Sequence, residues 1–243
     1  ACSLNCGFVI YACCSLGTPC KYVSSSAFVI SSPATTAKIS LFIVIFSFSS
    51  LNPLGQEEKI FYLETANTSY VMRLLPNGWL THVYYGKKVG RDDFHYYELF
   101  ANQCFSPLLW QEGKMCSSDT VPKEYAAFGR GDMRAASFAA AGENGRSIGE
   151  LSYVSHQIVA GKVLFSGMPQ LDAKPDEADT LIITLRDEVS GCETDLYYSV
   201  FEKEDIISRR TVVRDVTDQT VQLQQAASAM MDMESAEFDF VTL

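Results

Sequence analysis

One segment, Asp179 to Val216, constrains the fold of this 243-residue chain more than any other. It contains three runs, residues 180–186, 195–200 and 206–216, that are rich in β-branched and aromatic side chains. Apolar and polar residues alternate along the first two runs, apart from the apolar Ile182 on the polar face of the first. Successive side chains of a strand point to opposite faces, so such runs joined by short polar corners predict an antiparallel meander.

The distribution of charge divides the chain after residue 56. Residues 1–56 contain no acidic residue, and their only bases are Lys21 and Lys38. The remainder holds the other 17 of the 19 bases and all 29 acids, so its net charge is −12, against −10 for the whole chain. We therefore predict a non-domain extension over 1–56 and an all-β domain over 57–243. A chain this acidic lacks the basic footprint of a nucleic-acid-binding protein, so we expect no nucleic-acid partner.

The extension contains an apolar run, Leu41 to Phe46, that follows Lys38 and precedes several serines, as in the core of a signal peptide. The run is too short to span a bilayer as a helix and begins about forty residues into a chain that starts with alanine. Three interpretations stay open: a truncated leader, an interfacial anchor, or sequence read through from outside the true start. We favour the last, or another non-domain extension, and expect a poorly structured segment with no membrane partner.

Cysteine usage indicates a reducing environment for the main domain. Five of the eight cysteines lie in the first twenty residues, with neither the spacing nor the histidines of a standard zinc site. We interpret these five as unpaired thiols of a non-domain segment. Cys104, Cys116 and Cys192 are scattered through the rest of the chain and are expected to be reduced. This pattern predicts a cytoplasmic protein.

Shorter strands are predicted ahead of the meander. Alternating or β-rich runs predict strands over 60–64, 69–75, 79–85 and 151–158. Pro76-Asn77-Gly78 predicts a hairpin turn, because asparagine and glycine tolerate positive φ. Residues 90–132 lack this periodicity, and irregular segments on a β scaffold often carry contacts.

The candidate chemical groups do not assemble into a catalytic motif. Asp92-Asp93 is an adjacent pair whose side chains diverge in extended chain, so we interpret it as a solvated turn and not as a glycosidase pair. Arg130-Gly131-Asp132 spells an adhesion tripeptide, which arises readily by chance. His82 and His156 lie in predicted strands without metal-ligand spacing and are expected to be hydrogen-bonded structural residues. The sequence also lacks a Walker loop and a dinucleotide fingerprint, and we expect no catalytic residue, metal site or cofactor.

A series of short phrases resembles the opening of the microbial α-galactosidases of glycoside hydrolase family 36. In chain order the phrases are Thr68 to Met72, His82 to Lys87, Phe105-Ser106-Pro107, Glu124-Tyr125, Gly129 to Arg134, Asn144 to Arg146, Leu151 to His156, Gly161-Lys162, Gly167 to Pro169, and the rhythm of Thr180 to Arg209. The resemblance covers roughly residues 58–243. It is specific because the phrases keep the order and spacing of the family.

The resemblance implies an antiparallel β-supersandwich that precedes a catalytic (β/α)₈ barrel. The family's retaining mechanism uses an aspartate nucleophile and an aspartate acid/base, both in the barrel. Neither is found in this chain, so we expect no turnover by this polypeptide alone. The resemblance also implies a galactoside substrate only in the full enzyme, the catalytic barrel as a partner, and a homo-oligomer of that enzyme.

One substrate contact is implied at Asn102. Family members carry an aspartate three residues before the Phe-Ser-Pro phrase, and this aspartate reaches substrate. Asn102 occupies that position here, where an amide can still donate and accept hydrogen bonds to a sugar hydroxyl but carries no charge. The alternative is a loop asparagine that serves a turn.

Two functions from different classes stay open. The first is the non-catalytic N-terminal portion of an α-galactosidase, cut short by its gene model or by a premature stop. The second is a free-standing carbohydrate-binding or assembly module, with Trp79, Trp110, Tyr84 and Tyr85 as candidate sugar-stacking residues.

Overall fold

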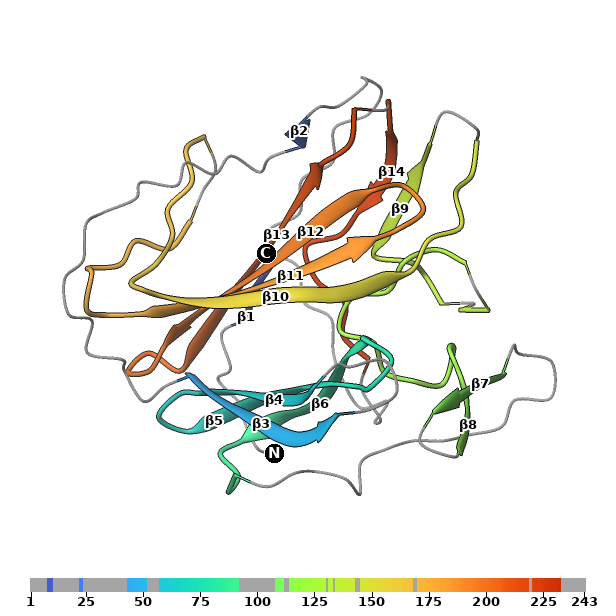
Figure 1. Cartoon of the computed structure of the whole chain (residues 1–243). Coiled ribbons are helices and arrows are strands. Elements are labelled where there is room, and N and C mark those ends of the chain that lie inside the picture. The colour runs from blue at the N-terminus through green and yellow to red at the C-terminus, as the bar shows by residue number, and fades with distance from the viewer. Residues whose placement is uncertain are drawn as a thin grey trace.

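The computed structural model describes residues 57–91, 108–111, 114–129, 131–132, 134–142, 145–167, 170–218 and 220–232, and the backbone of three earlier strands. Those earlier strands are β1 (Phe8–Ile10), β2 (Tyr22–Val23) and β3 (Ile43–Leu51). All regular elements in the described ranges are strands, and the two largest sheets face each other (Figure 1). The predicted all-β sandwich is therefore confirmed. Within the described part of the chain, no helix is long and apolar enough to cross a membrane.

The larger sheet contains the predicted meander. Its strands are β10 (Leu151–Ala160), β11 (Asp179–Asp187), β12 (Cys192–Phe201) and β13 (Ile206–Asp215), in the order β1-β13-β12-β11-β10 with β2 also on β13. The four long strands pair antiparallel, and only β1 runs parallel to its neighbour among the described pairings of this sheet. Leu181 lies opposite Tyr198 and Ile183 opposite Leu196, as expected for runs that share one apolar face.

The smaller sheet has the order β3-β4-β5-β6, with β4 (Glu57–Glu64), β5 (Thr68–Leu74) and β6 (Leu80–Lys87). The hairpin between β5 and β6 turns at Gly78, whose φ of 87° lies in the left-handed region that glycine adopts without steric cost. The amide of Gly78 donates to the carbonyl of Leu75 at 2.9 Å. Two further pairs complete the described strands: β7 (Leu108–Gln111) with β8 (Lys114–Ser117), and β9 (Phe138–Ala141) with β14 (Gln222–Ala226).

The main hydrophobic core lies between the two sheets. Its largest fully buried apolar side chains come from alternate positions on both sheets and include Phe61, Leu63, Tyr70, Met72, Leu74, Leu181, Ile183 and Tyr198. Alternation arises because one face of each sheet is turned inward. A separate cluster of Phe165, Ile182, Tyr197 and Val212 packs on the other face of the larger sheet. Ile182 is therefore buried, although it lies on the face of the run 180–186 where the other residues are polar.

The segment predicted as a non-domain extension contributes one long strand. β3 pairs antiparallel with β4, from Ile43 opposite Leu63 to Leu51 opposite Glu57, with a register shift between Phe48 and Leu51. β3 thus lies on one side of the boundary predicted after residue 56 and its partner on the other. That boundary stays a prediction.

Candidate functional site

The segment from Val121 to Tyr125 joins the two sheets. The amide of His82 donates to the carbonyl of Pro122 at 2.7 Å, and the amide of Glu124 donates to the carbonyl of Leu80 at 2.9 Å. The segment therefore lies against β6 in the manner of a short strand, with Thr81 opposite Lys123. Adjacent side chains in extended backbone point to opposite sides. Lys123 and Glu124 accordingly enter two different polar clusters.

The core cluster is centred on Glu124, whose side chain has no exposed surface. Its Oε1 accepts hydrogen bonds from Tyr70 Oη at 2.6 Å and from Tyr198 Oη at 2.8 Å. Arg209, also completely buried, places Nη1 2.7 Å from the same oxygen and donates from Nη2 to the Glu124 carbonyl at 3.0 Å. His82 Nδ1 lies 3.4 Å from Oε2. One carboxylate thus connects β5, β6, β12 and β13.

The ionisation of the core cluster follows from this geometry. Burial opposes the charge of Glu124, but the guanidinium of Arg209, the nearby imidazole of His82 and the hydrogen bond from Tyr70 outweigh it, so the pKa of Glu124 lies below its ordinary value. Burial, reinforced by the Glu124 charge, raises the pKa of Tyr70 well above its ordinary value. Burial likewise raises the pKa of Tyr198. A charged pair closed off in this way links strands of both sheets and has no surface on which to bind substrate.

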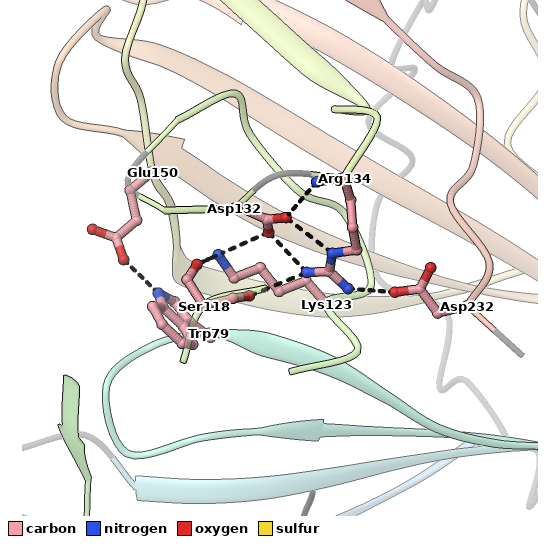
Figure 2. Close-up of polar contacts among 7 residues, drawn as sticks. All are labelled: Trp79, Ser118, Lys123, Asp132, Arg134, Glu150 and Asp232. Atoms are coloured by element: carbon pink, nitrogen blue, oxygen red, sulfur yellow. Dashed lines mark hydrogen bonds and ion pairs between the residues drawn. The ribbon is translucent and has the colours of Figure 1, made fainter. Parts of the chain in front are cut away.

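The rim cluster is built around Asp132 (Figure 2). Arg134 donates from Nε to Asp132 Oδ1 at 2.9 Å and from Nη2 to Oδ2 at 2.7 Å. Lys123 Nζ lies 3.4 Å from Asp132 Oδ2 and donates to Ser118 Oγ at 2.6 Å. The remaining Nη1 of Arg134 donates to the carboxylate of Asp232. Burial opposes the charge of Asp132, but Arg134 and Lys123 outweigh it and lower the pKa of that carboxyl.

Lys123 also connects the rim cluster to an aromatic residue. Its Nζ lies 4.3 Å from the centroid of the Trp79 ring, within the range of a cation–π interaction. The indole Nε1 of Trp79 donates to Glu150 Oε1 at 2.6 Å (Figure 2). Burial lowers the pKa of Lys123, although Asp132 and Glu150 oppose this shift. The rim cluster therefore ties the β5–β6 hairpin to the loops that follow β8 and β9.

The predicted site residue Asn102 lies outside the described residues, as do Asp92, Asp93 and Arg130. Asp132, the acid of the adhesion tripeptide, is buried and paired with Arg134, so its carboxylate is not presented to an adhesion partner. Both histidines have polar contacts: His82 beside Glu124, and His156, whose Nδ1 is 2.5 Å from Tyr153 Oη.

The candidate sugar-stacking aromatic residues differ in how far their rings are exposed. Trp79 is 2% exposed, so its ring belongs to the interior and not to a binding surface. Tyr84 and Tyr85 are half-buried and pack against hydrophobic clusters. The side chain of Trp110 lies outside the described residues.

Sequence reasoning missed both polar clusters. Glu124 appears in the sequence only within a phrase of the family resemblance, and Asp132 also as the acid of the adhesion tripeptide. Neither pattern points to an ion pair, because the main partner of Glu124, Arg209, lies 85 positions away and the burial of Asp132 depends on the tertiary fold. Within the described residues, no group of three or more His, Cys, Asp or Glu side chains is arranged to hold a metal ion.

Comparison with protein families identifies relatives of this chain. The model of the glycosyl hydrolase family 36 N-terminal domain matches residues 78–243. The bifunctional alpha-galactosidase/sucrose kinase AgaSK of Mediterraneibacter gnavus is 35% identical over 184 residues, which are 75% of this chain and 20% of AgaSK. Alpha-galactosidase AgaA of Geobacillus stearothermophilus is 34% identical over 190 residues, 77% of this chain and 26% of AgaA.

Solved structures agree with these matches. The galactosidase domain of AgaSK superimposes with a TM-score of 0.66 at 34% identity, over 70% of this chain and 24% of that one. A doubly substituted variant of AgaA in complex with raffinose gives a TM-score of 0.65 at 33% identity, over 70% of this chain and 24% of that one. The chain therefore spans about a fifth to a quarter of the length of these relatives, and the matched part is their N-terminal domain.

Proposed function

Because the chain belongs to the N-terminal domain family of glycosyl hydrolase family 36, we propose that it is the non-catalytic β-sandwich of an α-galactosidase. In this proposal a catalytic barrel outside these 243 residues hydrolyses terminal α-galactosides with retention of configuration. The sandwich packs on that barrel, the full enzyme is a cytoplasmic homo-oligomer, and neither nucleic acid nor membrane is a partner. One observation carries the proposal. Residues 78–243 match the N-terminal domain of glycosyl hydrolase family 36, and the chain covers only 26% of the length of α-galactosidase AgaA.

The geometry of the described residues supports a structural role for the sandwich. A retaining glycosidase needs two carboxyl groups about 5–5.5 Å apart with access to substrate. The two carboxylates at the centres of the clusters, Glu124 and Asp132, are instead buried against Arg209 and Arg134. Each is neutralised by an arginine, so neither is placed to act as an acid or a nucleophile.

Exposed apolar side chains support a packing partner for the sandwich. Phe128 is 50% exposed and Ile148 is 55% exposed, and the amide of Gly149 donates to the Phe128 carbonyl at 3.0 Å. The two residues therefore lie on neighbouring segments. Neighbouring exposed apolar side chains of this kind are a candidate for part of an apolar patch, and contiguous patches mark surfaces that contact another domain or subunit.

A hydrolysis assay tests the proposed activity. A longer protein that contains this chain and its barrel should hydrolyse p-nitrophenyl α-galactoside, and NMR should show that the first-formed galactose is the α anomer. The 243-residue chain alone should show no turnover at the same concentration. Hydrolysis by the short chain, or release of the β anomer by the longer protein, contradicts the proposal.

The role proposed for Asn102 is a hydrogen bond to the galactoside in the assembled enzyme. Replacement Asn102→Ala should raise KM for the galactoside by roughly tenfold, in the range of a lost hydrogen bond to a substrate hydroxyl. Asn102→Asp should retain most of the affinity, since the family carries an aspartate there. An unchanged KM in Asn102→Ala assigns this residue to the loop turn.

Calorimetry separates this proposal from a free-standing sugar-binding module. The 243-residue chain titrated with galactose and raffinose should give no binding heat, because Trp79 is buried and Tyr84 and Tyr85 pack against hydrophobic clusters. Saturable binding by the sandwich without a barrel supports the module instead.

A further inference from the structure

The segment Ala227–Asp232 follows β14 and leaves the sheet, and it lies outside every described strand. One backbone bond holds its start, from the amide of Ala227 to the carbonyl of Ser137 at 2.7 Å. Beyond that bond, side chains reach the segment from other elements. Tyr125 Oη donates to Ala227 O at 2.7 Å, Thr211 Oγ1 to Ser228 O at 3.0 Å, Arg209 Nη1 to Met230 O at 3.3 Å, and Arg134 Nη1 to the Asp232 carboxylate. We call residues 227–232 the strap.

The way the strap is held differs from the way a strand is held. A ladder of backbone hydrogen bonds breaks cooperatively, whereas separate side-chain contacts can open one at a time from an end. The contacts also change in character along the strap. Those to Ala227 and Met230 come from Tyr125 and Arg209, which are deeply buried, whereas the last comes from the half-buried Arg134. Among the contacts of residues 227–232, the one at Asp232 is therefore the most accessible to solvent.

The rim cluster fixes the orientation of the Arg134 guanidinium for this contact. Asp132 occupies Nε and Nη2 of the guanidinium and leaves Nη1 for Asp232 (Figure 2). Lys123 lies beside Asp132, so the buried carboxylate has two cationic neighbours. The side chain of Asp232 is 36% exposed, whereas that of Asp132 is 2% exposed. The inner pair thus fixes the guanidinium, and the outer pair is the contact that solvent and salt can reach.

We propose that Arg134 is a positioning residue that fastens the end of the strap and so sets the direction in which the chain runs on from Asp232. The fastening is a property of this chain alone. Its consequence, a fixed placement of the catalytic part relative to the sandwich, rests on the proposed function. In this proposal the Arg134–Asp232 ion pair, and not pairing in a sheet, sets the direction of the polypeptide that follows Asp232.

Hydrogen exchange with mass spectrometry tests the fastening in the 243-residue chain. Asp232→Asn keeps the size of the side chain and removes its charge, and should speed exchange of strap amides roughly two- to fivefold, the range of a partly exposed ion pair. Peptides from β11 and β12 should not change. Asp232→Glu should restore wild-type exchange, and 0.5 M NaCl should raise exchange in wild type but have little effect on Asp232→Asn.

The matched control is Glu177→Gln, which removes the same charge from the exposed Lys174–Glu177 pair, 2.9 Å long and outside the rim cluster. It should leave strap exchange unchanged. Equal strap exchange in wild type and Asp232→Asn overturns the fastening. Faster exchange throughout the sandwich also overturns it, because the ion pair would then support the whole fold and not the strap.

The placement is tested in a longer protein that carries the barrel. There Asp232→Asn should lower kcat/KM for an α-galactoside roughly tenfold, since a displacement of about 1 Å in an active site has effects of this order or larger. Asp232→Glu should recover it. Wild-type turnover with unchanged kcat/KM in Asp232→Asn overturns the placement. A wild-type protein without α-galactosidase activity overturns the proposed function, and the placement with it, while the exchange result for the fastening stands.

Discussion

Lys123 and Glu124 are neighbours in the chain, yet they belong to two clusters that differ in burial and in what they hold. Glu124 is completely buried and joins residues of both sheets, Tyr70 on β5 and Arg209 on β13 among them. Lys123 reaches the rim, where Asp132 and Arg134 connect loops to the strap. The two clusters contain similar ion pairs, but the core cluster joins the sheets, whereas the rim cluster joins loops and the strap.

The difference is a consequence of solvent access. A buried ion pair has lost the hydration of both charges, so removing one partner leaves the other uncompensated and costs about 3–5 kcal/mol. In the rim cluster the outer pair, Arg134–Asp232, is reached by water and contributes about 0–1 kcal/mol, and the buried Asp132 keeps a second cationic neighbour when one is removed. The core cluster should therefore determine whether the sandwich is folded, and the rim cluster should determine how its loops and strap are arranged.

The largest expected effect is that of Arg209→Met. This change keeps much of the side-chain volume but leaves the Glu124 carboxylate buried beside Tyr70 and Tyr198 with no guanidinium. The free energy of unfolding, measured by urea denaturation, should fall by about 3–5 kcal/mol. Arg186→Met, at a position with a 39% exposed side chain, is the matched control and should change it by less than about 0.5 kcal/mol. A loss below about 1 kcal/mol at Arg209 would remove the distinction between the clusters.

Acid should weaken the sandwich through the carboxylates of both clusters. The pKa values of Glu124 and Asp132 are lowered in the folded state, so the folded state binds fewer protons than the unfolded one as these groups titrate. Their contribution is complete above the unfolded values, about 4 to 4.5, and is lost as the pH falls through the lower folded values. Urea midpoints measured from pH 7 to pH 3 should therefore decrease below about pH 4.5. Glu124→Gln should flatten this decrease more than Glu177→Gln does.

A smaller effect is expected from single hydroxyl groups of the core cluster. Tyr70→Phe keeps the ring in the core and removes one hydrogen bond to a charged acceptor, which should cost about 1.5–3 kcal/mol. Tyr84→Phe removes an exposed hydroxyl that donates to the carbonyl of Lys87 at 2.9 Å, and should cost less than about 0.5 kcal/mol. Equal costs in urea denaturation would show that burial does not distinguish these bonds.

The sequence predicts the parts of this fold that depend on local pattern. The period of two along residues 180–186 and 195–200 places Leu181 and Tyr198 on one face, and the structure pairs them. Pro76-Asn77-Gly78 predicts its turn because few residues other than glycine adopt the φ found at Gly78. Both features are decided within about ten residues of chain.

The polar clusters lie beyond such local patterns. Glu124 follows a segment without periodicity, and its partners Tyr70 and Arg209 are 54 and 85 positions away. Asp132 drew attention as part of a tripeptide, whereas its burial depends on the tertiary fold. The strand at Ile43–Leu51 shows a related difficulty, because a short continuous apolar run is typical of both a leader core and an edge strand.

The most direct test of the difference between the two clusters compares the stability lost on substitution of Glu124 and of its neighbour Lys123. Glu124→Gln and Lys123→Met each remove one charge from adjacent positions, and urea denaturation at pH 7 gives the free energy of unfolding of each. Glu124→Gln leaves Arg209 buried without a counter-charge and should cost about 3–5 kcal/mol. Lys123→Met loses a mostly buried ion pair and a cation–π contact but leaves Asp132 paired with Arg134, so it should cost about 1 kcal/mol. A difference of at least about 2 kcal/mol is the predicted result, and equal losses would contradict the division into a core cluster and a rim cluster.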